Sequence, residues 1–336
     1  MEVKKTIVIA EAGVNHNGSL DIAKRMVDIA KDCGADYIKF QTFKAQAIAT
    51  SSASKADYQK QSLDEEQTQL EMLKQLELKE NDYLEILDYC SKISIKCFST
   101  GFDIESLKFL ESTNQELYKI PSGEITNLPY IEYIGSLNRE VILSTGISSM
   151  DEVSEAFTAL LRSGLDKDKI SILHCTSQYP ADIYDLNLNA IKTLKEKFNV
   201  RVGYSDHTQG IHIATAAVSL GARIIEKHFT VDKSLPGPDH ETSIEANELK
   251  TMISNIKDID LALGEGKKMA MPGELKNISM VRKSIVAKTD IKAGDIFSEE
   301  NITCKRPALG ISPMKWYEVI GRKSPSSFVV DDLIKL

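Results

Sequence analysis

Two histidines stand where consecutive strand-like runs end in this 336-residue chain. Residues 200–203 lead into Ser-Asp-His-Thr, and residues 224–225 lead into Glu-Lys-His, with one helix-length segment between them. Parallel strands joined by a helix keep their carboxyl ends on one edge of a sheet. We therefore expect His207 and His228 to meet there as metal ligands, with Asp239 following in a Pro/Gly turn. The alternative for each histidine is a strand cap that satisfies a turn.

Lysine and hydroxyl side chains follow several other predicted strands. Together, ammonium and hydroxyl groups can donate hydrogen bonds to an anion that carries both carboxylate and phosphate, which predicts a small phosphorylated acid as ligand. The candidate donors are Lys39, Lys119, Thr100, Ser122, Ser144 and Ser205. Candidates for proton transfer or for binding sugar hydroxyls are Glu11, Glu124 and Asp239.

Other chemistries fit fewer of these residues. Either lysine could form a Schiff base, as in an aldolase. Cys175 beside His174 could be a nucleophile, although a small buried thiol at a strand end is the simpler interpretation. The glycine-rich motifs of dinucleotide-binding and P-loop proteins are absent from the sequence, so no nucleotide cofactor is expected.

The elements that would position these side chains alternate regularly. Strand-like runs and helix-length amphipathic segments form eight pairs over about 260 residues, which predicts a (β/α)8 TIM barrel with its site at the carboxyl ends of the strands. The predicted strands span residues 6–11, 37–41, 96–100, 117–120, 141–144, 171–174, 200–204 and 223–228. Ser149 and Glu152 predict a capping box at the fifth helix.

Composition limits the class of protein. The chain has 41 Lys and Arg against 49 Asp and Glu, a net charge of −8, which argues against nucleic acid or anionic membrane as a partner. Five dispersed cysteines are typical of reduced thiols. With no transmembrane run or signal peptide in the sequence, we expect a cytoplasmic protein.

Two regions depart from the eightfold pattern. Residues 44–80 form a long insertion after the second strand, with Ser62, Glu65 and a helical stretch at 67–76, and loops at this face are often lids or substrate contacts. The barrel is expected to end at residue 264. A linker at 265–281 and a small domain at 282–336, with strand-like runs at 284–287 and 328–330, complete the chain.

Motifs along the whole chain resemble those of the sialic acid synthase family, which includes bacterial N-acetylneuraminate synthases and their legionaminic and pseudaminic acid relatives. The resemblance is carried by AEAGVNHNG (10–18), IKFQTFKA (38–45), KIPSGEITNLPY (119–130), ILSTG (142–146), LHCTSQYP (173–180), GYSDHT (203–208), IEKHFT (225–230), PGPDH (236–240), RKSIVAK (282–288) and KRPALGISP (305–313).

This resemblance implies a TIM barrel followed by an antifreeze-like (SAF) domain that is exchanged across a homodimer. It also implies condensation of phosphoenolpyruvate with an open-chain N-acetylated sugar and water, releasing phosphate by C–O cleavage. By the resemblance, His207 and His228 would bind Mn2+ or Mg2+, and Glu11 would position water or transfer the proton. Residues at the phosphoenolpyruvate-binding positions are Lys39, Thr100, Lys119, Ser122, Ser144 and Ser205.

The resemblance also implies where the sugar binds. The matching positions are Glu124, Tyr179, Asp239 and Arg306, the last of them from the partner chain. Two departures bear on the sugar: Gly101 stands where proline is expected, and Ser177 stands where Asn or Thr is common and the acetamido group can be contacted. N-acetylmannosamine, giving N-acetylneuraminate, is the first expectation. A 2,4-diacetamido-trideoxyhexose is the alternative, and residues 55–61 do not separate neuraminate from legionaminate synthases. A non-enzymatic barrel with a glycan- or ice-binding tail is a more distant hypothesis.

Overall fold

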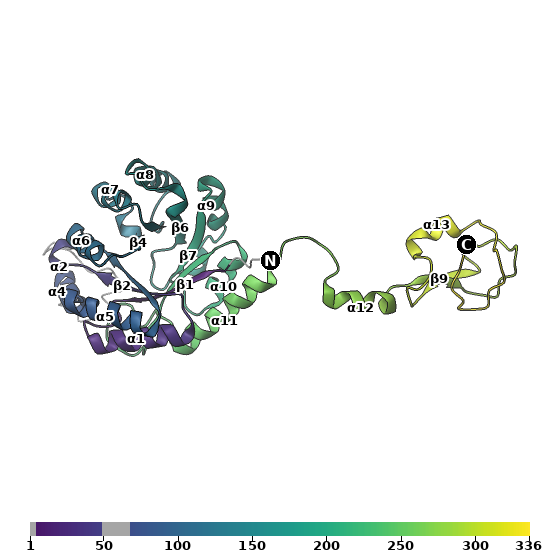
Figure 1. Ribbon diagram of the computed structural model, residues 1–336, viewed down its shortest axis with the longest axis horizontal. Coiled ribbons are helices and arrows are strands. Elements are labelled where there is room, and N and C mark those ends of the chain that lie inside the picture. Colours follow the sequence, from purple (N-terminus) through teal and green to yellow (C-terminus); the bar gives the residue numbers. More distant parts are fainter. Residues whose placement is uncertain (1–4, 49–67) are drawn as a thin grey trace. The chain divides into compact units, whose positions relative to one another are not determined.

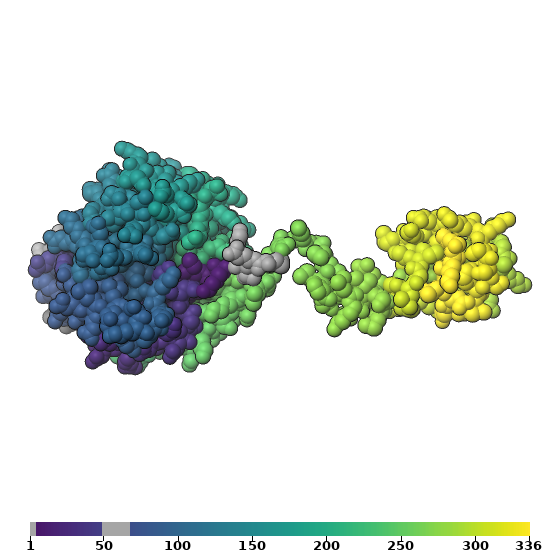
Figure 2. Space-filling view, in the orientation of Figure 1, coloured from purple at the N-terminus to yellow at the C-terminus, as the bar shows by residue number. Residues whose placement is uncertain are grey.

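The computed structural model describes residues 5–48 and 68–336. The chain divides into two compact units, Met1–Gly264 and Glu265–Leu336, each with a hydrophobic core of its own. Figure 2 shows the chain in space-filling form. Expectations that concern Ser62, Glu65 and residues 55–61 lie outside the described residues.

The first unit is an eight-stranded parallel barrel, as the alternating sequence pattern predicts (Figure 1). Hydrogen bonds link the strands in the order β4-β5-β6-β7-β8-β1-β2-β3, so the first and last strands of the unit are neighbours, and β3 and β4 come together at the remaining seam. The strands are β1 Ile7–Gly13, β2 Tyr37–Thr42, β3 Lys96–Gly101, β4 Leu117–Ile120, β5 Glu140–Ser144, β6 Ile170–Cys175, β7 Arg201–Asp206 and β8 Ile224–His228.

Helices surround this barrel and bury their apolar faces against the outside of the strands. The predicted capping box is present at α8, where Ser149 accepts from the Glu152 amide and Glu152 accepts from the Ser149 amide. The helices are α1 Leu20–Cys33, α2 Ala45–Ile48, α4 Gln69–Leu76, α5 Glu80–Ile93, α6 Ile104–Ser112, α7 Leu128–Ser136, α8 Met150–Arg162, α9 Ala190–Phe198, α10 His212–Ser219 and α11 Ala246–Ala262.

The described part of the 44–80 insertion packs onto the barrel beside β1. Met72 and Leu76 of α4 form a small apolar cluster with Val14 and Phe43. Thr68 caps α4 in a second capping box, with Glu71 as its partner. Of the helical stretch predicted at 67–76, the described part is a helix from Gln69 to Leu76.

The barrel interior has an apolar lower region, the lower cluster, made of Ile9, Phe98, Ile142, Leu173 and Ile224. β7 contributes Gly203 instead of a large side chain. A Cβ atom at Gly203 would lie 2.3 Å from the Ile224 carbonyl oxygen and 2.5 Å from Leu173 Cδ2, so only glycine allows this close approach.

The second unit combines a helix with a small β domain. The predicted linker contains α12 (Pro272–Val281), and β9 (Ser284–Ala287) pairs antiparallel with β10 (Ile302–Lys305). A short helix, α13 (Trp316–Val319), packs Val319 into the domain's own core. The strand expected at 328–330 is wrong. Phe328 makes one bridge to Ile291, after which the chain turns at Asp331, which has a φ of 76°.

Candidate active site

A cavity of about 240 Å3 opens among the carboxyl ends of the barrel strands. Most of the side chains that the sequence marks as candidates line it. These residues are Glu11, Lys39, Thr100, Lys119, Ser122, Ser144, Ser177, Tyr179, Ser205, His207 and His228. Because β1 to β8 are all parallel, residues up to 217 positions apart in sequence converge on one mouth.

A buried ionic network forms the floor of this cavity. Lys39 Nζ lies 2.9 Å from Glu11 Oε2 and 3.6 Å from Glu226 Oε2. Lys119 Nζ lies 2.6 Å from Glu226 Oε1, which also accepts a hydrogen bond of 2.9 Å from Ser205 Oγ. The four ionic groups are nearly inaccessible to solvent, so each depends on its neighbours for compensation.

The network moves the pKa values of its carboxyl groups in opposite directions. Burial raises the pKa of Glu11 to about 7, although Lys39 opposes this. Burial would also raise the pKa of Glu226, but Lys119 and Lys39 outweigh it and hold that pKa below its ordinary value. A carboxyl group that titrates near neutrality beside one that stays ionised is a pair suited to proton transfer.

Both lysines donate to carboxylates, but their pKa values shift in opposite directions. Burial would lower the pKa of Lys39, yet Glu11 and Glu226 raise it. Burial lowers the pKa of Lys119 against the opposing effect of Glu226. A Schiff base needs a free amine as nucleophile, and a lysine that donates to a carboxylate at 2.6 Å is poorly prepared for that step.

Hydroxyl groups occupy the rim on the side of β3 to β6. Lys39 Nζ donates to Thr100 Oγ1 at 3.1 Å, and the Gly146 amide donates to Ser122 Oγ at 3.0 Å. A Cβ at position 146 would lie 2.1 Å from Ser177 Oγ, so the glycine leaves room for both serines. Ser144 Oγ is buried, has no partner in the part of the chain that the structure describes, and can serve a ligand.

The two predicted metal ligands do lie side by side at the mouth. The ring centroids of His207 and His228 are 5.6 Å apart, and the Tyr179 ring lies 4.1 Å from that of His207. His207 Nδ1 bonds the Thr176 carbonyl oxygen at 2.7 Å, which assigns the proton to Nδ1 and leaves Nε2 as an electron-pair donor. Burial, followed by the influence of His207, lowers the pKa of His228 well below its ordinary value and keeps that imidazole neutral.

These features fit a cation with two protein ligands. His228 Nδ1 is buried and has no hydrogen-bond partner among the described residues, a state that a bound cation or its water would relieve. Among the described residues there is no cluster of three or more His, Cys, Asp or Glu side chains suited to a metal. Two imidazole ligands would leave most positions around a cation open to substrate.

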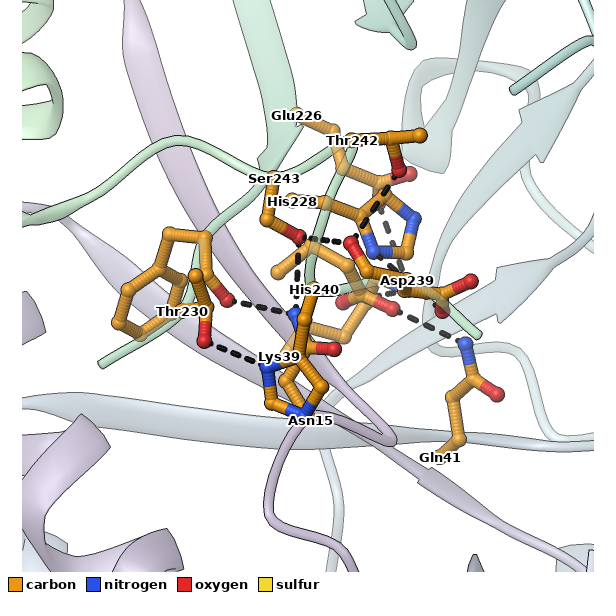
Figure 3. Close-up of polar contacts among 12 residues, drawn as sticks. Asn15, Lys39, Gln41, Glu226, His228, Thr230, Asp239, His240, Thr242 and Ser243 are labelled. Atoms are coloured by element: carbon orange, nitrogen blue, oxygen red, sulfur yellow. Dashed lines mark hydrogen bonds and ion pairs between the residues drawn. The ribbon is translucent and has the colours of Figure 1, made fainter. Parts of the chain in front are cut away.

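Asp239 reaches the same pair from the loop that follows β8. Its Oδ2 lies 3.8 Å from His228 Nδ1, and burial raises the pKa of Asp239 to about 6. Figure 3 shows how the loop is tied down: Asn15 donates to the Phe229 carbonyl and to Ser243 Oγ, both at 2.9 Å. Ser243 Oγ in turn donates to the Asp239 carbonyl at 2.6 Å.

Three predicted sugar contacts are not among the residues that line this cavity: Asp239, described above, Glu124 and Arg306. Glu124 lies in the turn after β4, half-buried, and accepts from Asn127 Nδ2 at 2.6 Å. Arg306 is exposed in the second unit, which is described by itself.

Glu226 is the main residue that sequence reasoning missed. It precedes His228 by two positions, so strand alternation alone places it on the same inner face. Gln41, near the end of β2, also lines the cavity and donates to Glu11 Oε1 at 3.3 Å.

Both parts of the chain match known protein families. Residues 26–268 match the NeuB family and residues 282–336 match the SAF domain. The chain is 49% identical to N,N'-diacetyllegionaminic acid synthase of Campylobacter jejuni, over 99% of this chain and 100% of that protein. It is 45% identical to the synthase of the same name from Legionella pneumophila, over 94% and 89% of the two chains.

A solved structure extends the likeness to three dimensions. The crystal structure of N-acetylneuraminic acid (sialic acid) synthetase from Leptospira borgpetersenii, in complex with citrate, matches with a TM-score of 0.72 and 35% identity, over 82% of this chain and 90% of that one. Within the described residues, no helix combines the length and apolar character needed to cross a bilayer.

Proposed function

This chain belongs to the NeuB family of sialic acid synthases, and on that premise we propose that it joins phosphoenolpyruvate to a 2,4-diacetamido-trideoxyhexose to make a legionaminic-type acid. The cluster of paired lysines and hydroxyls beside two imidazoles carries the proposal, because it offers one place for an enol phosphate and one for an aldehyde.

The diacetamido sugar takes precedence over N-acetylmannosamine, which the sequence motifs alone had favoured. Both relatives that share nearly half of their residues with this chain are named for legionaminic acid. N-acetylmannosamine is kept as the competing substrate, because the solved structure that resembles this chain is named for N-acetylneuraminic acid.

Phosphoenolpyruvate would bind over the ionic floor. Its carboxylate and phosphate can accept from Lys39, Lys119 and the surrounding hydroxyls of Thr100, Ser122, Ser144 and Ser205. Glu226 keeps both ammonium groups charged and close before the anion arrives, which lowers the reorganisation that binding requires.

The sugar aldehyde would approach the histidine side of the cavity. His207 and His228 would hold Mn2+ or Mg2+, which supplies Lewis-acid polarisation of the aldehyde oxygen. Tyr179 and Asp239 flank these imidazoles and can contact sugar hydroxyls, and Ser177 and Glu124 are further candidates for binding its substituents.

The bond changes balance as one condensation. Carbon 3 of phosphoenolpyruvate forms a bond to the aldehyde carbon, whose oxygen takes a proton, and water adds at carbon 2. The tetrahedral adduct then loses phosphate with the bridging oxygen, leaving the 2-keto acid. Glu11, with its pKa near 7 and its carboxylate beside Lys39, is positioned to accept the proton of the attacking water.

A phosphate-release assay over a panel of sugars tests the proposal. We expect turnover with phosphoenolpyruvate plus 2,4-diacetamido-2,4,6-trideoxymannose at a kcat/KM at least tenfold above that with N-acetylmannosamine. Phosphoenolpyruvate labelled with 18O at the bridging position should release labelled phosphate. A higher kcat/KM with N-acetylmannosamine would overturn the sugar assignment, and unlabelled phosphate would overturn C–O cleavage.

Metal dependence has its own test. His207→Ala and His228→Ala should lose bound Mn2+ and activity together, and a chelator should stop the wild-type protein until Mn2+ is restored. Unchanged metal content in both variants would disprove the ligand assignment.

Arg306 belongs to the proposed homodimer, in which the SAF domain of one subunit covers the site of the other. Arg306→Ala should raise the KM for the sugar while leaving metal content intact. If the domains are exchanged, mixing Arg306→Ala with His207→Ala subunits should restore about a quarter of wild-type activity through one intact site per mixed dimer. Purely additive residual activities would argue that each chain completes its own site.

A further inference from the structure

A buried ion pair lies directly behind the two histidines. Asp206 and Lys227 are register partners on β7 and β8. Each precedes a histidine, and because side chains alternate along a strand, they point away from the cavity that His207 and His228 line. Their side chains are 0% and 1% exposed.

The lysine joins the chain on both sides of His207. Lys227 Nζ donates to Asp206 Oδ2 and to the Thr208 carbonyl oxygen, each at 2.7 Å. Asp206 Oδ1 accepts from the Thr208 amide at 3.0 Å and from Thr208 Oγ1 at 2.8 Å. The residue before His207, the residue after it and the residue before His228 therefore form one hydrogen-bonded unit.

Stability alone does not explain this unit. A buried ion pair gives little net stability compared with a well-packed apolar pair, because both charges must leave water. Its distinctive property is directional: two hydrogen bonds from one ammonium group fix the backbone around His207 relative to that around His228.

We propose that Asp206, Thr208 and Lys227 are positioning residues that set the separation of the His207 and His228 imidazoles before a divalent cation binds. The inference rests on the proposed function, in which these imidazoles are metal ligands. Preformed ligand geometry reduces the ordering that binding requires, and partners behind the ligands typically change metal affinity by about 10- to 100-fold.

The test measures Mn2+ affinity of the full-length protein, from the electron paramagnetic resonance signal of free Mn2+. Asp206→Asn and Lys227→Met should each raise the Mn2+ dissociation constant at least tenfold. The double variant should be little weaker than either single one, because the pair acts as a unit.

A matched control lies at the opposite end of the barrel. Asp260 is a buried carboxylate that accepts from the Thr6 amide and Thr6 Oγ1 at 2.6 and 2.8 Å, with Arg223, the residue before β8, at 3.7 Å. Asp260→Asn should lower the melting temperature and leave Mn2+ affinity within twofold of wild type. If Lys227→Met does not fold, Thr208→Val removes one hydrogen bond of the unit and should still weaken Mn2+ binding severalfold.

The outcomes separate the two hypotheses. The metal site, and this inference with it, would be overturned if the wild-type protein did not bind Mn2+. The same would follow if wild type and His207→Ala bound Mn2+ with equal affinity. Binding that needs His207 but is unchanged in folded Asp206→Asn, Lys227→Met and Thr208→Val would overturn the inference alone.

Discussion

The lower cluster and the floor of the cavity are built from the same strands, two residues apart. Along every strand except β7, where Gly203 takes this place, an apolar side chain that packs the lower interior is followed, at the next inward position, by a residue that lines the cavity. The pairs are Ile9 and Glu11, Tyr37 and Lys39, Phe98 and Thr100, Leu117 and Lys119, Ile142 and Ser144, Leu173 and Cys175, and Ile224 and Glu226.

The difference teaches how one barrel separates stability from chemistry. Each fully buried aliphatic side chain of the lower cluster contributes about 1.5–3 kcal/mol by leaving water. Two residues further along the strands, the barrel encloses the ionic groups of the floor. These groups can stabilise the fold only when every charge keeps its partner. The lower cluster therefore supplies stability to the barrel that the ionic floor does not supply.

The largest effect is expected when one charge is removed from the ionic floor. Glu226→Leu leaves Lys39 and Lys119 without their shared carboxylate, and should lower the free energy of unfolding by about 3–5 kcal/mol and abolish phosphate release. Urea denaturation and the phosphate assay measure both. Glu226→Gln, which keeps the shape, should lose activity with a smaller loss of stability. A Glu226→Leu protein as stable as wild type would show that the network is not interdependent.

A substitution in the lower cluster should separate stability from activity. Leu173→Ala creates a cavity between strands and should lower the free energy of unfolding by about 2–5 kcal/mol. Because the ionic floor stays complete, kcat/KM at 25 °C should remain within about threefold of wild type. A hundredfold loss of kcat/KM in protein that is folded would contradict the division between the two regions.

Acid should lower the free energy of unfolding through His16, which lies in the loop after β1. Burial, with a smaller effect of His240, lowers the pKa of His16 to about 4. The unfolded chain binds a proton near pH 6.5 and the folded one resists it, so stability is complete above pH 6.5 and is lost as the pH falls towards 4. The loss should reach about 3 kcal/mol. Urea denaturation of wild type and His16→Gln at pH 7 and pH 4.5 isolates this contribution, and equal acid losses in both would refute it.

The smallest effect is expected from an ion pair outside both regions. Lys24 and Glu85 approach to 2.5 Å on the helical surface, with side chains 28% and 53% exposed. Lys24→Gln should change the free energy of unfolding by less than about 1 kcal/mol, because water screens the pair. If Lys24→Gln lowered the free energy of unfolding as much as Glu226→Leu does, the cost of losing an ion-pair partner would not depend on burial.

Much of the site could be predicted from the sequence because a parallel barrel has a simple rule. Strand ends share one edge, so polar residues such as Lys39, Lys119 and His207 converge once eight repeats are recognised. The inward direction of Glu226 could have been inferred from strand alternation. Its pairing with Lys39 and Lys119 could not, because those lysines lie on other strands. The strand expected at 328–330 failed because a single bridge and a left-handed turn at Asp331 are tertiary outcomes of short apolar runs.

The sequence by itself determined the barrel, the family and the two histidines, since these depend on periodicity and on ordered local motifs. Tertiary structure decided which charges neutralise each other, because that depends on distances between strands far apart in the chain. Lys119 finds its carboxylate 107 residues away, on β8, and Asp206 and Lys227 become partners only when β7 and β8 lie in register. Burial then makes each of these pairings obligatory.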